Sequence, residues 1–184
     1  PLLRTDGNLQ NISFVFKLID KLGLNKKKFF KTINKFKGLN FRQQIIYKTK
    51  NLTIINDSKA TSFSSTISLL KSLKNVYWIL GGIPKKGDKL LLSKNDCKSL
   101  KAYIFGKNKK KFFKDLNKKF SCQMFENLDL TIKKVFSDIK NDSNNKHKIL
   151  LFSPAAASFD QFKNFEDRGK YFNTRIKKIL NNGY

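Results

Sequence analysis

Short apolar runs alternate with longer amphipathic segments over most of this chain, and this alternation constrains the fold more than any other feature. Runs of 4–5 residues rich in β-branched and aromatic side chains predict strands at residues 43–47, 52–55, 76–80, 102–105, 122–125 and 148–152. Apolar residues at three- and four-residue steps predict helices at residues 63–73, 93–100, 109–119, 128–140 and 159–180. Strand and helix in alternation imply an α/β fold, a Rossmann-like and mainly parallel sheet with flanking helices.

The first forty residues follow a different pattern. Apolar positions from Leu9 to Ile19 indicate a helix over residues 8–22 that Gly23 ends, and Phe29, Ile33 and Phe36 indicate a second helix that ends at Gly38. The change of pattern predicts a domain boundary near residues 38–41, with a short helical unit at 1–40 and the α/β domain at 41–184. The predicted strands at 43–47 and 52–55 are close enough to pair as a hairpin.

The chain is strongly basic, with a formal net charge of +26 over 184 residues. Such a charge attracts polyanions, and a basic nucleic-acid-binding module is therefore an alternative function. Lysines are nevertheless spread over several predicted elements rather than gathered in one stripe, and the chain is also rich in Asn, Ile and Phe. This distribution favours a solvated surface, whose lysines reflect a general bias in composition, over a specific nucleic-acid site.

The cysteines and the hydropathy of the chain indicate the cellular compartment in which the protein is expected. Cys97 and Cys122 lie in separate segments, without zinc-ligand spacing and without a disulfide framework. No apolar run approaches the roughly 20 residues that a membrane-spanning helix needs. The start at Pro1 shows neither an initiator Met nor a leader pattern, which suggests missing upstream residues. We expect a monomeric, cytoplasmic protein without a membrane span or a metal site of its own.

Polar residues gather where three predicted strands end, at the edge where parallel sheets bind ligands. The first group is Asn56-Asp57-Ser58-Lys59-Ala60-Thr61. One helix cap needs only one such residue, whereas four polar groups within five positions suit ribose hydroxyls and phosphates, with Asp57 accepting and Lys59 donating.

The second group is Gly81-Gly82-Ile83-Pro84-Lys85-Lys86-Gly87-Asp88. The paired glycines allow a sharp turn at a strand end, and a lysine follows within four residues. The group is not a P-loop, because Gly-Lys-Ser/Thr occurs nowhere in the chain. Taken alone, it would be read as a plain turn with solvated lysines.

The third group runs from Phe152 to Gly169 as Phe-Ser-Pro-Ala-Ala-Ala-Ser-Phe-Asp-Gln-Phe-Lys-Asn-Phe-Glu-Asp-Arg-Gly. Small residues after the strand leave room for a ligand, and a helix that starts near Ser158 would offer unpaired N–H groups to an anion. The aromatic residues Phe162, Phe165 and Phe172 follow a helical rhythm and are expected in the core.

The three groups together, in this order and at these separations, resemble the Mur ligase family from about Gly7 to the end of the chain. The pattern Ser-Pro-Ala-x-Ala-Ser-x-Asp-Gln-Phe-x-Asn-Phe-Glu-x-Arg-Gly resembles the branch that adds D-glutamate. The Asp-Asn-Pro-Arg pattern typical of the diaminopimelate-adding branch is absent. The resemblance implies that residues 41–184 are the family's C-terminal domain and residues 1–40 the last helices of its central ATPase domain.

The resemblance also implies roles for single residues. Nucleotide binding falls to Asn8, Arg42, Asp57 and Lys59, and D-glutamate binding to Thr61, Lys85, Ser158, Phe159 and Phe165. No catalytic residue and no metal ligand is implied. The family usually has His where this chain has Gly7, and often His and an acid where it has Phe41 and Gln43.

The family reaction uses ATP and Mg²⁺ to join D-glutamate to UDP-N-acetylmuramoyl-L-alanine during peptidoglycan precursor synthesis. The P-loop, the Mg²⁺ ligands and the UDP-binding domain would precede Pro1, so the resemblance implies a part of a ligase that is inactive alone. A degenerate fragment that keeps only the fold is a further alternative.

Overall fold

A computed structural model describes residues 6–36, 38–93, 95–96 and 99–183. The helices of this part of the chain are α1 (Asp6–Lys21), α2 (Lys26–Lys35), α3 (Phe63–Ser72), α4 (Lys109–Leu116), α5 (Leu128–Asn141) and α6 (Phe165–Asn181). The strands are β1 (Gln44–Lys48), β2 (Leu52–Asn56), β3 (Val76–Gly81), β4 (Leu100–Phe105), β5 (Ser121–Phe125) and β6 (Lys148–Phe152).

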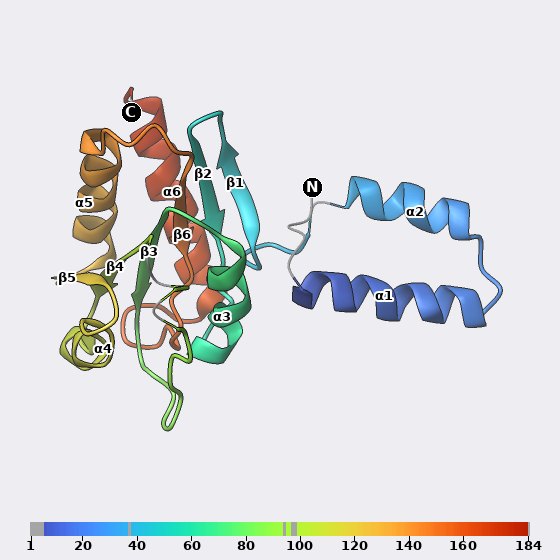
Figure 1. Cartoon of the computed structure of the whole chain (residues 1–184), viewed down its shortest axis with the longest axis horizontal. Helices are drawn as coiled ribbons and strands as arrows, with labels where there is room; N and C mark the ends of the chain where they lie inside the picture. The colour runs from blue at the N-terminus through green and yellow to red at the C-terminus, as the bar shows by residue number, and fades with distance from the viewer. Residues whose placement is uncertain (1–5, 37, 94, 97–98, 184) are drawn as a thin grey trace.

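The strands form one twisted sheet in the order β1-β2-β6-β3-β4-β5 (Figure 1). β1 pairs with β2 antiparallel as the predicted hairpin, and every other neighbouring pair is parallel. β6 lies between β2 and β3, so the last strand of the chain occupies the centre of the sheet. The predicted α/β class with a mainly parallel sheet is confirmed.

Helices cover both faces of the sheet, because successive side chains of its inner strands point to opposite faces and are apolar on both. On one face Trp78 and Leu80 pack with buried residues of α3 and α4. On the other face Tyr77 and Ile79 pack with buried residues of α5 and α6. The result is a three-layer sandwich of helices, sheet and helices.

The helical pair α1 and α2 lies to one side of this sandwich (Figure 1). Its two helices meet through Phe16, whose ring centroid is 5.7 Å from that of Phe29 and 5.5 Å from that of Phe30. Much of its apolar surface stays exposed, as Phe14 at 72% shows. None of the helices in the described part of the chain is long and apolar enough to cross a membrane.

Two predicted helices differ from the structure. The expected short helix at 93–100 is wrong for the described residues, because 95, 96 and 99 lie in turns and β4 already begins at Leu100, while residues 94, 97 and 98 lie outside the described residues. The expected start of the last helix at residue 159 is also wrong, since α6 begins at Phe165. Its N-cap is Asn164, whose side chain accepts the Asp167 N–H at 2.7 Å, while Gln161 and Phe162 donate back to the Ser158 carbonyl in a turn.

Candidate functional site

The three polar groups predicted from the sequence meet at one edge of the sheet. They are the 56–61 loop after β2, the 81–88 loop after β3 and the 153–164 loop after β6, and these strands are neighbours in the sheet. The Asp57 N–H donates to the Phe152 carbonyl at 2.7 Å. Ile83 and Ala157 exchange two backbone hydrogen bonds of 2.9 Å. Backbone pairing therefore joins all three loops.

The paired glycines permit this close approach. Gly82 has a φ of 130°, and a Cβ atom there would lie 2.2 Å from the Ala157 carbonyl oxygen. A side chain at this position would collide with backbone that cannot give way. Gly82 thus brings the 81–88 and 153–164 loops together, whereas a Cβ atom at Gly81 would lie 2.2 Å from the Phe105 carbonyl oxygen of β4.

The side chain of Arg168, in α6, links the 56–61 loop to the 153–164 loop. Its side chain is fully buried. Nε donates to Ser58 Oγ at 3.1 Å, Nη2 to the Ser58 carbonyl at 2.8 Å and Nη1 to the Ala156 carbonyl at 3.0 Å. Burial lowers the pKa of this guanidinium to about 10, so Arg168 keeps its charge at neutral pH.

Asp57, predicted to contact a nucleotide, is turned inward and only 3% exposed. Its Oδ1 accepts the Gln43 N–H at 3.0 Å and its Oδ2 accepts the Ser153 hydroxyl at 2.8 Å. Burial raises the pKa of Asp57 to about 7, although both hydrogen bonds and the charge of Arg42 oppose the shift. Asp57 therefore titrates near neutral pH.

Lys59, predicted to contact a phosphate, lies on the surface beside a predicted D-glutamate residue. Its Nζ is 4.1 Å from the centre of the Phe165 ring, a cation–π contact. The Phe165 carbonyl accepts the Ser58 hydroxyl at 2.8 Å, which ties the start of α6 to the 56–61 loop. Thr61 is exposed at the end of the same loop.

Lys85, predicted to bind D-glutamate, is exposed in the 81–88 loop and lines a cavity of about 400 Å³ between this loop and α4. Asp88 holds the end of the loop, because its carboxylate accepts the Phe63 N–H at the first turn of α3. Lys86 is also exposed but does not line this cavity.

Ser158 and Phe159 have opposite environments. Ser158 is 2% exposed, whereas Phe159 is 71% exposed. The expectation that Ser158 begins a helix is wrong, because it precedes α6 by seven residues and its carbonyl closes a turn. Ser158 follows Ala157, which pairs with Ile83 of the 81–88 loop, but the cavity that Lys85 lines includes none of Thr61, Ser158, Phe159 and Phe165.

Asn8 and Arg42, predicted to contact the nucleotide, line one cavity of about 210 Å³, whose other lining residues all belong to α1, α2 and the segment that follows α2. Asn8 Nδ2 donates to Gln43 Oε1 at 2.9 Å, and the Gln43 backbone contacts Asp57. Gln43 thus connects α1 with the 56–61 loop. The structure brings Asn8, Arg42 and Asp57 together at the junction of the two units.

Phe41, where the chain departs from the family pattern, anchors this junction. Its ring is 8% exposed and packs so closely on α6 that a Cβ atom at Gly169 would lie 2.4 Å from it. The Phe41 carbonyl accepts the Lys59 N–H at 2.9 Å. Both Phe41 and Gln43 have positive φ, an unfavourable backbone conformation for residues other than glycine.

The described residues include no group of three His, Cys, Asp or Glu side chains that could hold a metal ion. Cys97 lies outside the described residues. Cys122 is half-buried, and burial raises the pKa of its thiol to about 12, which keeps it protonated.

Sequence reasoning missed Arg168, Gln43 and Ser153. The sequence does contain a sign of the buried Arg168. This residue falls on the same helical face as Phe165, Phe172 and Ile176, an apolar face that is expected to be buried. The sequence contains no such sign for Gln43 and Ser153. Their role depends on contact with Asp57, which lies 14 and 96 residues away from them in the chain.

The chain is similar to curated proteins named UDP-N-acetylmuramoylalanine–D-glutamate ligase. The ligase of Rickettsia prowazekii is 35% identical over 165 residues, 90% of this chain and 37% of that protein. The ligase of Francisella tularensis strain SCHU S4 is 36% identical over 178 residues, 95% of this chain and 42% of that protein. This chain is a relative of the Mur ligases. It spans about two fifths of the length of these relatives.

A solved Mur ligase has the same fold. The UDP-N-acetylmuramate–alanine ligase of Thermotoga maritima superposes with a TM-score of 0.63 at 16% identity, covering 96% of this chain and 39% of that chain. At this identity the likeness concerns the fold alone. No protein-family model matches the chain. The resemblance to the Mur ligases that the three loops predicted is confirmed.

Proposed function

We propose that this chain is the part of an ATP-dependent ligase that holds the D-glutamate pocket and a portion of the ATP site. The ligase would join D-glutamate to UDP-N-acetylmuramoyl-L-alanine through a new amide bond in peptidoglycan synthesis, in the cytoplasm and as a monomer. One observation carries the proposal: the loops that resemble the D-glutamate-adding branch converge at one edge of the sheet, in a chain 35% identical to ligases of that name.

The two structural units have separate places in this proposal. Residues 41–184 would be the C-terminal domain of the ligase and residues 1–40 the last helices of its central domain. The nucleotide would lie at their junction, near Asn8, Arg42 and the 56–61 loop. Arg42 and Lys59 would offset phosphate charge, while the buried Asp57 would fix the loop.

The D-glutamate pocket would lie between the 81–88 and 153–164 loops. Lys85 would pair with a carboxylate of D-glutamate, and Thr61, Ser158, Phe159 and Phe165 would complete the pocket. These residues would act by orienting the amino acid, so that its amine is held for attack on an activated carboxylate. The described residues offer no cluster fit for Mg²⁺, and the proposal assigns its ligands to other segments of the ligase.

The basic nucleic-acid-binding alternative fits the structure less well. Single-strand binders of this kind present aromatic side chains and lysines on an exposed sheet face. Here helices cover both faces of the sheet, and the aromatic residues of its inner strands, such as Trp78 and Phe152, are fully buried.

The proposed D-glutamate pocket can be tested on the chain itself. We expect D-glutamate to shift the amide NMR signals around Lys85 and Ser158 in ¹⁵N-labelled protein more than L-glutamate does. Lys85→Ala should weaken this response on the order of tenfold or more, because a charge-assisted contact contributes about 1.5–3 kcal/mol. Ser158→Ala should act in the same direction but more mildly, since it removes a neutral hydroxyl.

Lys86→Ala is the matched control, a neighbouring lysine of the same loop with the same change of charge. It should leave the response to D-glutamate within about twofold of the unmodified chain. Equal effects of the two lysine changes, or equal responses to D- and L-glutamate, would contradict the assignment of this pocket.

The proposal also predicts that the purified 184-residue chain forms no amide product from ATP, D-glutamate and UDP-N-acetylmuramoyl-L-alanine. The physical reason is that the sequence contains no Gly-Lys-Ser/Thr loop to cradle the transferred phosphate. Chromatographic detection of the product is the measurement, with an intact ligase as the positive control. Amide formation by the chain alone would contradict the proposal that the reaction needs further segments of the ligase.

A further inference from the structure

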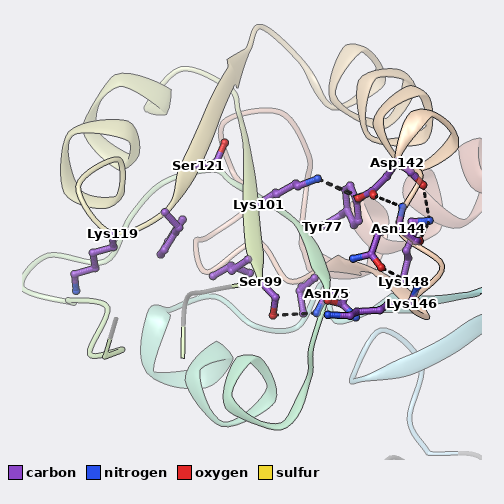
Figure 2. Close-up of a pocket in the computed structure, with 13 residues that line it drawn as sticks. Asn75, Tyr77, Ser99, Lys101, Lys119, Ser121, Asp142, Asn144, Lys146 and Lys148 are labelled. Carbon is purple, nitrogen blue, oxygen red and sulfur yellow. Dashed lines mark hydrogen bonds and ion pairs between the residues drawn. The ribbon is translucent and has the colours of Figure 1, made fainter. Parts of the chain in front are cut away.

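A second cavity, of about 720 Å³, opens at the opposite edge of the sheet from the three loops (Figure 2). It is lined by the first residues of β3, β4 and β5 and by the segment that leads into β6. Because these strands are parallel, their amino ends meet at this edge. The size is in the usual range for a small-molecule site.

Four lysines and one carboxylate line this cavity. Lys101, Lys146 and Lys148 lie on one side of it, and Lys119 lies on the other (Figure 2). The carboxylate is Asp142, which already accepts hydrogen bonds from the Tyr77 hydroxyl and the Asn144 N–H and pairs with Lys101 at 3.2 Å. The cavity therefore carries a strong excess of positive charge.

Two of the ammonium groups are held by backbone carbonyls and still keep N–H groups free. Lys148 Nζ donates to the carbonyls of Asp142 and Asn144, both at 2.9 Å, which leaves one of its three N–H groups. Lys119 Nζ donates to the Leu90 carbonyl at 2.7 Å, which leaves two. Lys146 Nζ makes no hydrogen bond or ion pair with any residue that the structure describes.

A structural role accounts for only some of these lysines. The carboxyl ends of α3, α4 and α5 point to this edge, and their partial negative charge favours nearby cations. This role fits Lys148, which binds carbonyls just beyond α5, and Lys119, which follows α4. It does not fit Lys146, whose ammonium is unused by the described residues.

We propose that this cavity binds a small anion with two or more phosphate groups. Closely spaced phosphates match several ammonium groups around one concave surface. Nucleic acid is disfavoured, because the aromatic residues of the wall, Tyr77 and Phe120, are only 2% and 9% exposed and offer no ring for stacking a base.

Sodium tripolyphosphate is the probe, titrated into the 184-residue chain by calorimetry at low ionic strength. We expect saturable binding that the double variant Lys101→Gln/Lys146→Gln weakens by about tenfold or more, since each charge-assisted contact is worth about that factor. Lys148 is left unchanged because it holds two carbonyls of the fold. The single variant Lys146→Gln should show part of this loss of affinity. It removes no contact of the fold, because the Lys146 ammonium makes none with the described residues.

Three controls locate the site. Lys110→Gln/Lys133→Gln removes the same charge from exposed positions on α4 and α5 and should weaken binding less than about twofold. Lys86→Gln, in the 81–88 loop at the opposite edge, should have as little effect. Oligo-dT should bind equally to the unmodified chain and to the double variant.

Absence of saturable tripolyphosphate binding would overturn the proposal. So would equal weakening by the two double variants, which would show that the charge acts diffusely. A loss with Lys86→Gln would place the phosphates at the opposite edge of the sheet. A greater loss for oligo-dT than for tripolyphosphate in Lys101→Gln/Lys146→Gln would identify a nucleic-acid surface instead.

Discussion

Replacing Arg168 by Met is expected to lower the free energy of unfolding by about 3–5 kcal/mol, because each buried acceptor left without its donor costs about 1–3 kcal/mol. The change leaves the carbonyls of Ser58 and Ala156 buried without their donors. It also frees the 56–61 loop from the 153–164 loop. Urea unfolding followed by circular dichroism is the measurement.

Arg175→Met is the matched control, because Arg175 lies on the same helix. It pairs with Asp129 at 2.7 Å, but both side chains are 31% exposed, so the loss should stay under about 1 kcal/mol. Arg168→Lys should fall between the two, since lysine keeps the charge but not the planar fork. If Arg168→Met cost no more than Arg175→Met, the buried network would not be what holds the two loops.

Local pattern predicts most of the fold because the forces that form its elements are local. The alternation of apolar runs located each strand of the described residues, and Gly23 marked the end of α1, whereas α2 ends at Lys35, three residues before Gly38. The start of α6 was misplaced, because the apolar rhythm of Phe159 and Phe162 continues upstream of the true N-cap at Asn164. The cap and the two acids that follow it carried the better signal.

The sequence predicted which loops form the candidate site, but it predicted the orientation of their side chains less well. Polar residues after β2, β3 and β6 predicted one ligand-binding edge, and the insertion of β6 between β2 and β3 makes these loops neighbours. The sequence could not show that Asp57 turns inward, because Gln43 and Ser153 hold it from distant segments. Burial of a carboxylate depends on tertiary packing, which no local pattern contains.

Replacing Asp57 by Asn is expected to stabilise the chain at pH 8 and to leave its stability nearly unchanged at pH 4. The folded protein raises the pKa of Asp57 from 3.8 to about 7, so between these values the folded state binds more protons than the unfolded state. The contribution of Asp57 to stability is therefore complete below about pH 4 and is lost as pH rises through 7. The full loss corresponds to up to about 4 kcal/mol, at roughly 1.4 kcal/mol per pKa unit.

Asparagine can keep every contact that Asp57 makes. Its Oδ1 can accept the Gln43 N–H, and its Nδ2 can donate to Ser153 Oγ. Ser153 can then donate to Thr66 Oγ1, 3.0 Å away, and Thr66 to the Ser62 carbonyl. The protonated carboxyl can make the same chain of hydrogen bonds, which is why the variant should match the unmodified protein at low pH.

The difference in free energy of unfolding between Asp57→Asn and the unmodified chain should be measured by urea titration from pH 4 to pH 8. Asp142→Asn is the control of opposite sign, because hydrogen bonds from the Tyr77 hydroxyl and the Asn144 N–H, together with Lys101, hold the pKa of Asp142 well below its usual range. The stability that Asp142 contributes is fully present above about pH 4 and is lost only below it, so this variant should be destabilised by the same amount across the whole range from pH 4 to pH 8. A difference for Asp57→Asn that stays flat across the range would show that Asp57 is ionised throughout, and that Arg42 and the two hydrogen bonds outweigh its burial.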